Sequence, residues 1–196
     1  ATPAYKTSFT ATRSFVDLGN GNTSNTVLAS ASVQTYAGTP TAVDSVVVNG
    51  IQAVLAITGY YVVDGSMGLE LSTENLTWRI GDQATGMAFE QSLSDIAYPA
   101  VSPITSATLI PNGGGYTFTC AGVSGADSVV FVLGPLQKRF AGNVASCTFT
   151  AEEIAGLATE LYQGTITALR SRTTTVGDVR FRSAKADARA QMILVE

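Results

Sequence analysis

Residues 147–164 (CTFTAEEIAGLATELYQG) contain the clearest helix signal in the chain, and a helix here limits how the flanking strands can connect. Thr150 and Glu153 have the spacing of a capping box, in which each side chain accepts a hydrogen bond from the other residue's backbone N–H. An apolar stripe follows at helical spacing, formed by Ile154, Leu157 and Leu161. Gly164 is suited to end the helix, because glycine adopts the left-handed conformation at low cost. We therefore expect one helix over residues 151–162.

Other segments of the chain predict β-strands, because apolar and polar residues alternate over short runs separated by turn residues. Asn49-Gly50 is the strongest hairpin signal, since both central positions of its turn need a positive φ. In the first half, strands are expected at residues 5–16, 26–36, 43–48, 51–57, 60–63, 69–71 and 76–80. Residues 85–98 stay open, because their apolar spacing fits a short helix but no good capping residue precedes it.

The second half has the strand and turn spacing of a β-sandwich, with short strands that are each followed by a turn signal. Strands are expected at residues 104–110, 116–121, 128–133, 145–149, 165–172, 179–183 and 186–194. Pro99 and Pro103 bracket a short segment that we interpret as a linker. The sequence thus predicts an all-β protein with a β-rich domain over residues 1–100 and a β-sandwich with one short helix over residues 101–196.

Residues 102–196 resemble the immunoglobulin-like modules of bacterial secreted proteins and phage virion proteins. The strand rhythm, the strand-to-helix junction TFTAEEIAGL (148–157) and the following strand GTITAL (164–169) carry the resemblance. It implies an immunoglobulin-like β-sandwich. The segment departs from antibody domains, because no tryptophan lies between its two cysteines. Residues 1–100 resemble no family.

Cys120 and Cys147 both fall on inward-facing strand positions by alternation. If the order of strands is immunoglobulin-like, their two strands are neighbours in one sheet. A disulfide across these strands would then form in an oxidising compartment. Two buried free thiols that pack as small apolar groups are the alternative, and the sequence leaves both open.

Composition excludes much chemistry. The chain has no histidine, which excludes a Ser-His-Asp triad, a Cys-His pair and an HExxH zinc site. Two cysteines alone do not make a structural zinc site, and a calcium loop over residues 17–25 lacks the bidentate acid that such loops use. The carboxylate pairs Glu70/Glu74 and Glu152/Glu153 are weak candidates for glycoside hydrolysis. We therefore expect no enzyme, no cofactor and no metal.

Charge is divided unevenly along the chain. Residues 1–100 carry eight acids and three bases, whereas residues 101–196 carry seven acids and eight bases. Six basic residues near the C-terminus are the predicted interface: Arg170, Arg172, Arg180, Arg182, Lys185 and Arg189. We expect them to form a stripe that contacts the acidic half of another copy or an acidic neighbour. A solvated face is the alternative, and few aromatic residues accompany the stripe, so nucleic acid is not an expected partner.

Only 13% of residues are charged, against about 25% in typical globular proteins. A neutral polar surface of this kind favours a non-enzymatic structural protein. The prediction is a phage virion component (capsid decoration, neck or tail) whose partners are copies of itself or other virion or filament proteins. A secreted or cell-surface bacterial protein is the alternative, either a pilus subunit or adhesin, or a carbohydrate-binding module that uses Trp78 or surface tyrosines. No run reaches the ~18 apolar residues of a membrane span.

Overall fold

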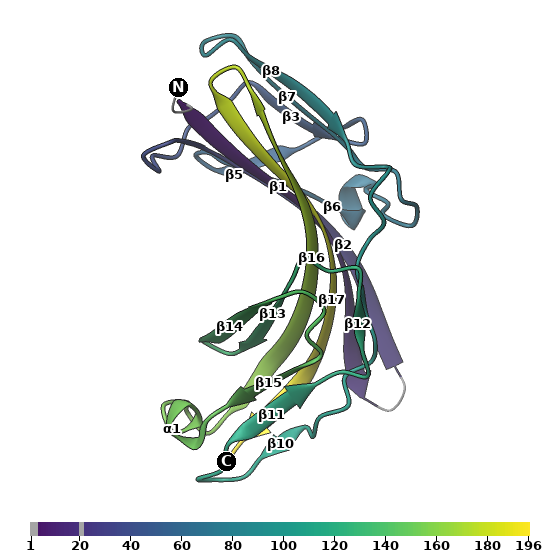
Figure 1. The fold of residues 1–196 in the computed structure, drawn as a ribbon, viewed down its shortest axis with the longest axis vertical. Helices are drawn as coiled ribbons and strands as arrows, with labels where there is room; N and C mark the ends of the chain where they lie inside the picture. The colour runs from purple at the N-terminus through teal and green to yellow at the C-terminus, as the bar shows by residue number, and fades with distance from the viewer. Residues whose placement is uncertain (1–3, 20–21) are drawn as a thin grey trace. The chain divides into compact units, whose positions relative to one another are not determined.

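The computed structural model describes residues 4–19 and 22–196, and within them the fold is all-β, as predicted (Figure 1). The strands are β1 (Tyr5–Gly19), β2 (Asn22–Thr35), β3 (Ser45–Val48), β4 (Ile51–Gln52), β5 (Val54–Ile57), β6 (Tyr60–Asp64), β7 (Thr77–Asp82), β8 (Met87–Ser92), β9 (Ala100–Val101), β10 (Leu109–Ile110), β11 (Tyr116–Thr119), β12 (Val123–Ser124), β13 (Ser128–Leu133), β14 (Leu136–Ala141), β15 (Ser146–Phe149), β16 (Leu161–Val176) and β17 (Val179–Val195). The helical elements are one 3₁₀ turn, η1 (Gly65–Met67), and one short helix, α1 (Ala151–Ile154).

The chain forms two compact units, each assembled from separate segments. Unit 1 consists of Ala1–Arg13, Thr26–Tyr98 and Ser171–Lys185, and unit 2 of Ser14–Asn25, Pro99–Arg170 and Ala186–Glu196. The segments meet at Tyr98 and Pro99, close to the expected linker. The units nevertheless differ from a division into residues 1–100 and 101–196, because β1, β2, β16 and β17 each contribute residues to both.

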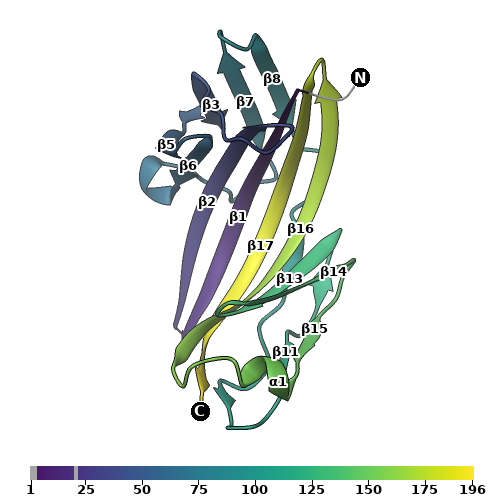
Figure 2. The same cartoon turned by 90° about the vertical axis from the view of Figure 1, so that its left-hand side faces the viewer.

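The largest sheet has the strand order β14-β13-β16-β17-β1-β2-β6-β5. Figure 2 shows the long strands β16, β17, β1 and β2 next to one another in this order. Both β1 and β17 begin in unit 1 and end in unit 2, so these two neighbours run parallel. The short strand β10 also pairs with β17 in parallel, with Leu109 opposite Leu194. Alternation along single strands does not predict such parallel pairs.

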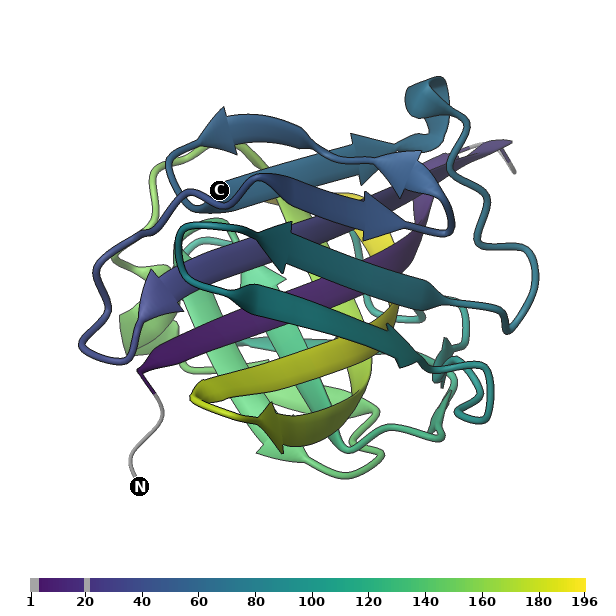
Figure 3. The ribbon, with the colours of Figure 1, turned by 90° about the horizontal axis from the view of Figure 1, so that it is seen from above.

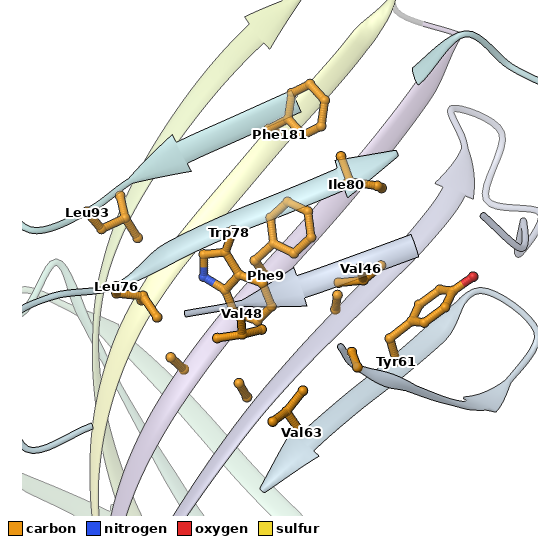
Figure 4. Packing of buried hydrophobic residues seen from close by; sticks show 14 of the residues in the cluster. Phe9, Val46, Val48, Tyr61, Val63, Leu76, Trp78, Ile80, Leu93 and Phe181 are labelled. Atoms are coloured by element: carbon orange, nitrogen blue, oxygen red, sulfur yellow. The ribbon is translucent and has the colours of Figure 1, made fainter. Parts of the chain in front are cut away.

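Unit 1 is a sandwich in which the sheet β4-β3-β7-β8 packs on the unit 1 part of the large sheet. In Figure 3 the teal strands β7 and β8 lie across the purple strand β1. The Phe9 ring stacks on Trp78 (Figure 4), at a centroid distance of 4.7 Å. Phe181 stacks on Phe89 at a centroid distance of 3.4 Å. Trp78 is only 1% exposed. The sugar-stacking role considered for Trp78 is therefore wrong, because no ligand reaches its ring.

The predicted hairpin at Asn49-Gly50 is confirmed, with φ angles of 47° and 83° at the two positions. It joins β3 to β4, and Val48 lies opposite Ile51. Residues 85–98, left open by the sequence, form strand β8 and a following loop rather than a helix.

Unit 2 has its own core, with β11 and β15 packed on β13, β16 and β17. Three fully buried phenylalanines form its centre: Phe118, Phe131 and Phe149. The pairing of β11 with β15 places Phe118 opposite Cys147. The unit therefore combines several small antiparallel pairings with the parallel pair of β10 and β17 around one core.

The capping box at Thr150 is confirmed, but the helix is much shorter than predicted. The Glu153 N–H donates to Thr150 Oγ1 at 3.2 Å, and the Thr150 N–H donates to Glu153 Oε2 at 2.7 Å. The helix ends at Ile154, and Leu161 already begins β16 and is exposed. The pairing of β16 with β13 makes this segment a strand instead of a helix, since it places Gly164 opposite Leu133.

Gly164 is therefore a strand residue, and not the end of a helix. A Cβ atom at this position would lie within van der Waals overlap of Ile193 Cδ1 and 3.0 Å from Phe118 Cζ. Two core side chains thus occupy the space that any other residue would need.

We predict that Gly164→Ala lowers the free energy of unfolding by about 1–3 kcal/mol, because the added methyl group overpacks this core. Gly122→Ala is the matched control, since the nearest atom to its Cβ would be 3.8 Å away. Urea denaturation followed by tryptophan fluorescence and circular dichroism measures both variants. Equal stability of the two would contradict the packing at Gly164.

Candidate functional site

The six basic residues of the predicted interface do not form one stripe. They lie on β16 and β17, but those two strands contribute to both units, and the six side chains have different partners. Lys185 and Arg189 hold loops in place, Arg172 is in an ion pair, and Arg170 is half-buried. The remaining two, Arg180 and Arg182, line a surface hollow.

Lys185 is 0% exposed, so the prediction that it contacts a partner is wrong. Its ammonium group donates to the carbonyl oxygens of Glu74 and Ile96 and to Glu74 Oε2 at 3.2 Å. It also lies 4.7 Å from the centroid of the Tyr98 ring. Burial lowers the pKa of Lys185, although its hydrogen bond to Glu74 acts in the opposite direction. Lys185 therefore connects two loops of unit 1 to β17.

Arg189 has a similar role in unit 2. Its Nε donates to the Val101 carbonyl at 2.9 Å, and its guanidinium group stacks 4.0 Å from the centroid of Phe15. The Val101 N–H donates to Asp187 Oδ2 at 2.9 Å. Strand β9 is thus held to β17 through both the N–H and the carbonyl group of one residue.

Arg172 forms an ion pair with Asp95 at 2.6 Å in unit 1. The hydrogen bond from Arg172 lowers the pKa of the Asp95 carboxyl group. Both side chains are exposed to solvent, so this pair adds little to stability. It does, however, occupy the guanidinium group that was expected to face a partner.

Arg180 and Arg182 line a hollow of about 250 Å³ on unit 1. The lining residues are Lys6, Thr7, Ser8, Gln34, Arg180 and Arg182. No carboxylate lies among them, and within residues 4–19 and 22–196 none of the three basic side chains has an ion-pair partner. We call this feature the basic hollow.

The parallel pairing of β1 with β17 assembles the basic hollow. Lys6 alternates along β1 with buried Thr7, and Arg180 and Arg182 alternate along β17 with buried Phe181. The three basic residues thus belong to the sheet face turned away from the core. Sequence reasoning missed Lys6, because nothing in the local pattern indicates that residues 6 and 180 lie on neighbouring strands.

A second surface feature is the edge strand β5. It ends the order of the large sheet, and within the described part of the chain it pairs only with β6. Its side chains are exposed and apolar, with Val54 53%, Leu55 49% and Ile57 70% exposed. The sequence predicted a strand here but did not show that it lies at an edge.

Cys120 and Cys147 are free and buried, so the structure has the second of the two alternatives. Cys120 directly follows β11, and Cys147 lies on the neighbouring strand β15 opposite Phe118. The Cys120 thiol donates to the Gly122 carbonyl at 3.4 Å. Burial raises the pKa of both thiols, which makes them poor nucleophiles.

Two members of the candidate carboxylate pairs have structural roles. Glu153 completes the capping box and forms an ion pair with Lys138 at 2.7 Å, while Glu74 accepts hydrogen bonds from the Tyr98 N–H and from Lys185.

Among the described residues no group of three His, Cys, Asp or Glu side chains is placed to bind a metal ion. The possible calcium loop over residues 17–25 falls partly outside the described residues. No described helix is long and apolar enough to cross a membrane.

Comparison with known proteins adds no family. No family model matches the chain, and no curated protein matches it significantly.

We predict that Lys185→Met lowers the free energy of unfolding by about 2–5 kcal/mol, since two buried carbonyl oxygens lose their donor at a cost of about 1–3 kcal/mol each. Arg180→Gln, a surface substitution on the same strand, should change it by less than about 0.5 kcal/mol. Urea denaturation at pH 7 compares the two variants. Similar small losses would show that Lys185 is not buried in unit 1.

The lowered pKa of Lys185 also predicts a pH dependence. Between the folded-state pKa and the ordinary value of 10.5 the unfolded chain holds the proton and the folded chain does not. The stability contributed by this group therefore rises with pH through that window and is constant below it. Denaturant melts from pH 7 to 10 should show the rise in the wild type relative to Lys185→Met. A constant difference between the two proteins would contradict it.

Proposed function

We propose that this protein is a non-enzymatic structural subunit that associates with copies of itself through the edge strand β5. The observation that carries the proposal is a strand without charged residues at the end of a sheet, whose apolar side chains are about half exposed or more. Such a strand presents unpaired N–H and C=O groups, and natural monomers usually protect them with charges, prolines or bulges. Strand β5 has no charge and no proline, and although its pairing with β6 shifts register between Leu55 and Ile57, Val54 and Leu55 pair regularly and offer a template for another strand.

The strand at the opposite edge of the same sheet, β14, carries charged residues of the kind that protect an edge. Strand β14 carries Lys138 and Arg139 in its centre, and both side chains are engaged. Lys138 donates to the Thr148 carbonyl at 2.9 Å, and Arg139 donates to Ser128 Oγ at 2.9 Å. Strand β5 has no charged residue, and this contrast supports β5 as the edge that associates.

A second copy fits β5 better than a charged partner does. In an antiparallel pair about a two-fold axis, Val54 would lie opposite Ile57 of the other copy, and no like charges would meet. The apolar surface continues into β6, where Val54 pairs with Val62 and Ile57 pairs with Tyr60. Pairing of the edges would bury this surface, which otherwise stays exposed.

We further propose that the assembly is a virion structure, such as a capsid decoration, neck or tail, with other virion or filament proteins as additional partners. The low content of charged residues and the all-β fold support this proposal. A secreted bacterial surface protein is the second candidate, supported by the sequence resemblance of residues 102–196 to immunoglobulin-like modules and by the packing of β11 and β15 on β13, β16 and β17 in unit 2. Neighbouring genes for portal or capsid proteins would support the first candidate, and an encoded signal peptide the second.

We predict that the wild type shows concentration-dependent self-association in sedimentation velocity, and that Val54→Lys with Ile57→Lys shifts it to the monomer. The added charges would repel across the two-fold axis, whereas both side chains are exposed in the monomer and the fold should persist. Val176→Lys is the matched control, because Val176 is 46% exposed and lies outside β5. Circular dichroism checks that all three proteins are folded.

Repeating the sedimentation experiment at different salt concentrations distinguishes association through β5 from association through the basic residues. Contacts through β5 are apolar and backbone-mediated, so added sodium chloride should not weaken them, while ion pairs on the surface are screened. Dissociation by salt, together with monomeric Arg180→Glu/Arg182→Glu, would instead assign the interface to the basic hollow. A wild type that is monomeric at every concentration would overturn self-association through β5.

A further inference from the structure

The basic hollow brings together three positive charges, none of which forms an ion pair within residues 4–19 and 22–196. Lys6, Arg180 and Arg182 line it together, from two neighbouring strands. Like charges on adjacent strands are destabilising, since each raises the potential at the others. Two other cations of unit 1 have an ion-pair partner, Arg172 with Asp95 and Lys185 with Glu74. The cluster is therefore suited to an external anion.

The hydrogen-bonding groups of the basic hollow are rich in donors. Each arginine offers five N–H donors and the lysine three, and the Gln34 amide and the Ser8 hydroxyl add more. No carboxylate lines the hollow to compete as an acceptor. These donors complement a ligand group that has several acceptor oxygens and no hydrogen-bond donors of its own.

Charge and size favour phosphate over a single carboxylate. Three positive side chains exceed the charge of one carboxylate, whereas a phosphate group carries about −1.5 to −2 at pH 7. Planar guanidinium groups bind its oxygens in pairs. The hollow, at about 250 Å³, also has room for a group much larger than one water molecule of about 30 Å³.

We propose that the basic hollow is a binding site for a phosphate group, either free inorganic phosphate or the phosphate of a small organic ester. The side chains project from β1, β2 and β17, which are hydrogen-bonded within one sheet and hold the donors in place. Lys6 is further positioned by Tyr36, whose ring centroid is 5.8 Å from its Nζ. The site does not depend on self-association through β5, which involves another part of unit 1.

The first test is isothermal titration of the wild type with inorganic phosphate at pH 7.5 and constant ionic strength. We expect saturable binding with one site per chain, and a loss of at least tenfold in affinity for Arg180→Gln/Arg182→Gln. Arg79→Gln with Arg139→Gln is the matched control, because it removes the same charge from β7 and β14, outside the hollow. Equal weakening in the control, or equal binding of acetate, would show general charge attraction and overturn the site.

Two further titrations address the source and the charge of the ligand. Glycerol 3-phosphate that binds as well as inorganic phosphate would assign the site to esters, and weaker binding would assign it to the free anion. A phosphate monoester has a second pKa of about 6. Its affinity should therefore fall severalfold from pH 7.5 to 5.5, while that of sulfate, whose charge is constant, should not. Binding of neither phosphate nor its ester at millimolar concentration would overturn the proposal, whatever the oligomeric state.

Discussion

One face of β17 supports the structure of both units. At odd-numbered positions, Phe181 packs in the core of unit 1, and Ile193 and Val195 pack in the core of unit 2. Between them the same face carries five polar residues: Ser183, Lys185, Asp187, Arg189 and Gln191. Each has a hydrogen-bond partner from residues 74–116. A slip of one residue would turn every one of these groups to the wrong face, so the register of this strand is strongly specified.

The polar residues of β17 explain why several of the basic residues cannot contact a partner. Lys185 and Arg189 lie on the face that packs against other parts of the chain, and their charges are used to bind carbonyl oxygens there. Arg180 and Arg182 have even numbers and lie on the other face, where no core covers them. All four residues are basic, but the face of β17 on which each one lies decides whether it has a structural role or remains available to bind a ligand. The two surface features, the basic hollow and β5, are both parts of the large sheet that the folded units leave uncovered.

Local signals predicted local structure well. The capping box at Thr150 and the hairpin at Asn49-Gly50 are confirmed, because both depend on interactions between residues close in sequence. The helix after Thr150 is shorter than expected, since Leu161 already belongs to β16, which pairs with β13 further along the chain. The alternating alanines of β17 predicted a strand, and Ala184, Ala186, Ala188 and Ala190 are indeed buried, but the other face is buried as well, with Ile193 and Val195 in the core of unit 2. Alternation shows that the two faces differ in residue type, without showing that both are buried.

The sequence by itself determined the all-β class, the main turns, the capping box and the lack of histidine-based chemistry. Only the tertiary structure decided that β1 and β17 run parallel, that β5 is an edge, and that Lys185 is buried. The physical reason is that these features depend on contacts between segments far apart in the chain, as between Lys6 and Arg180 in the basic hollow. Propensity and alternation act within a few residues, whereas strand order follows from which faces can be buried together.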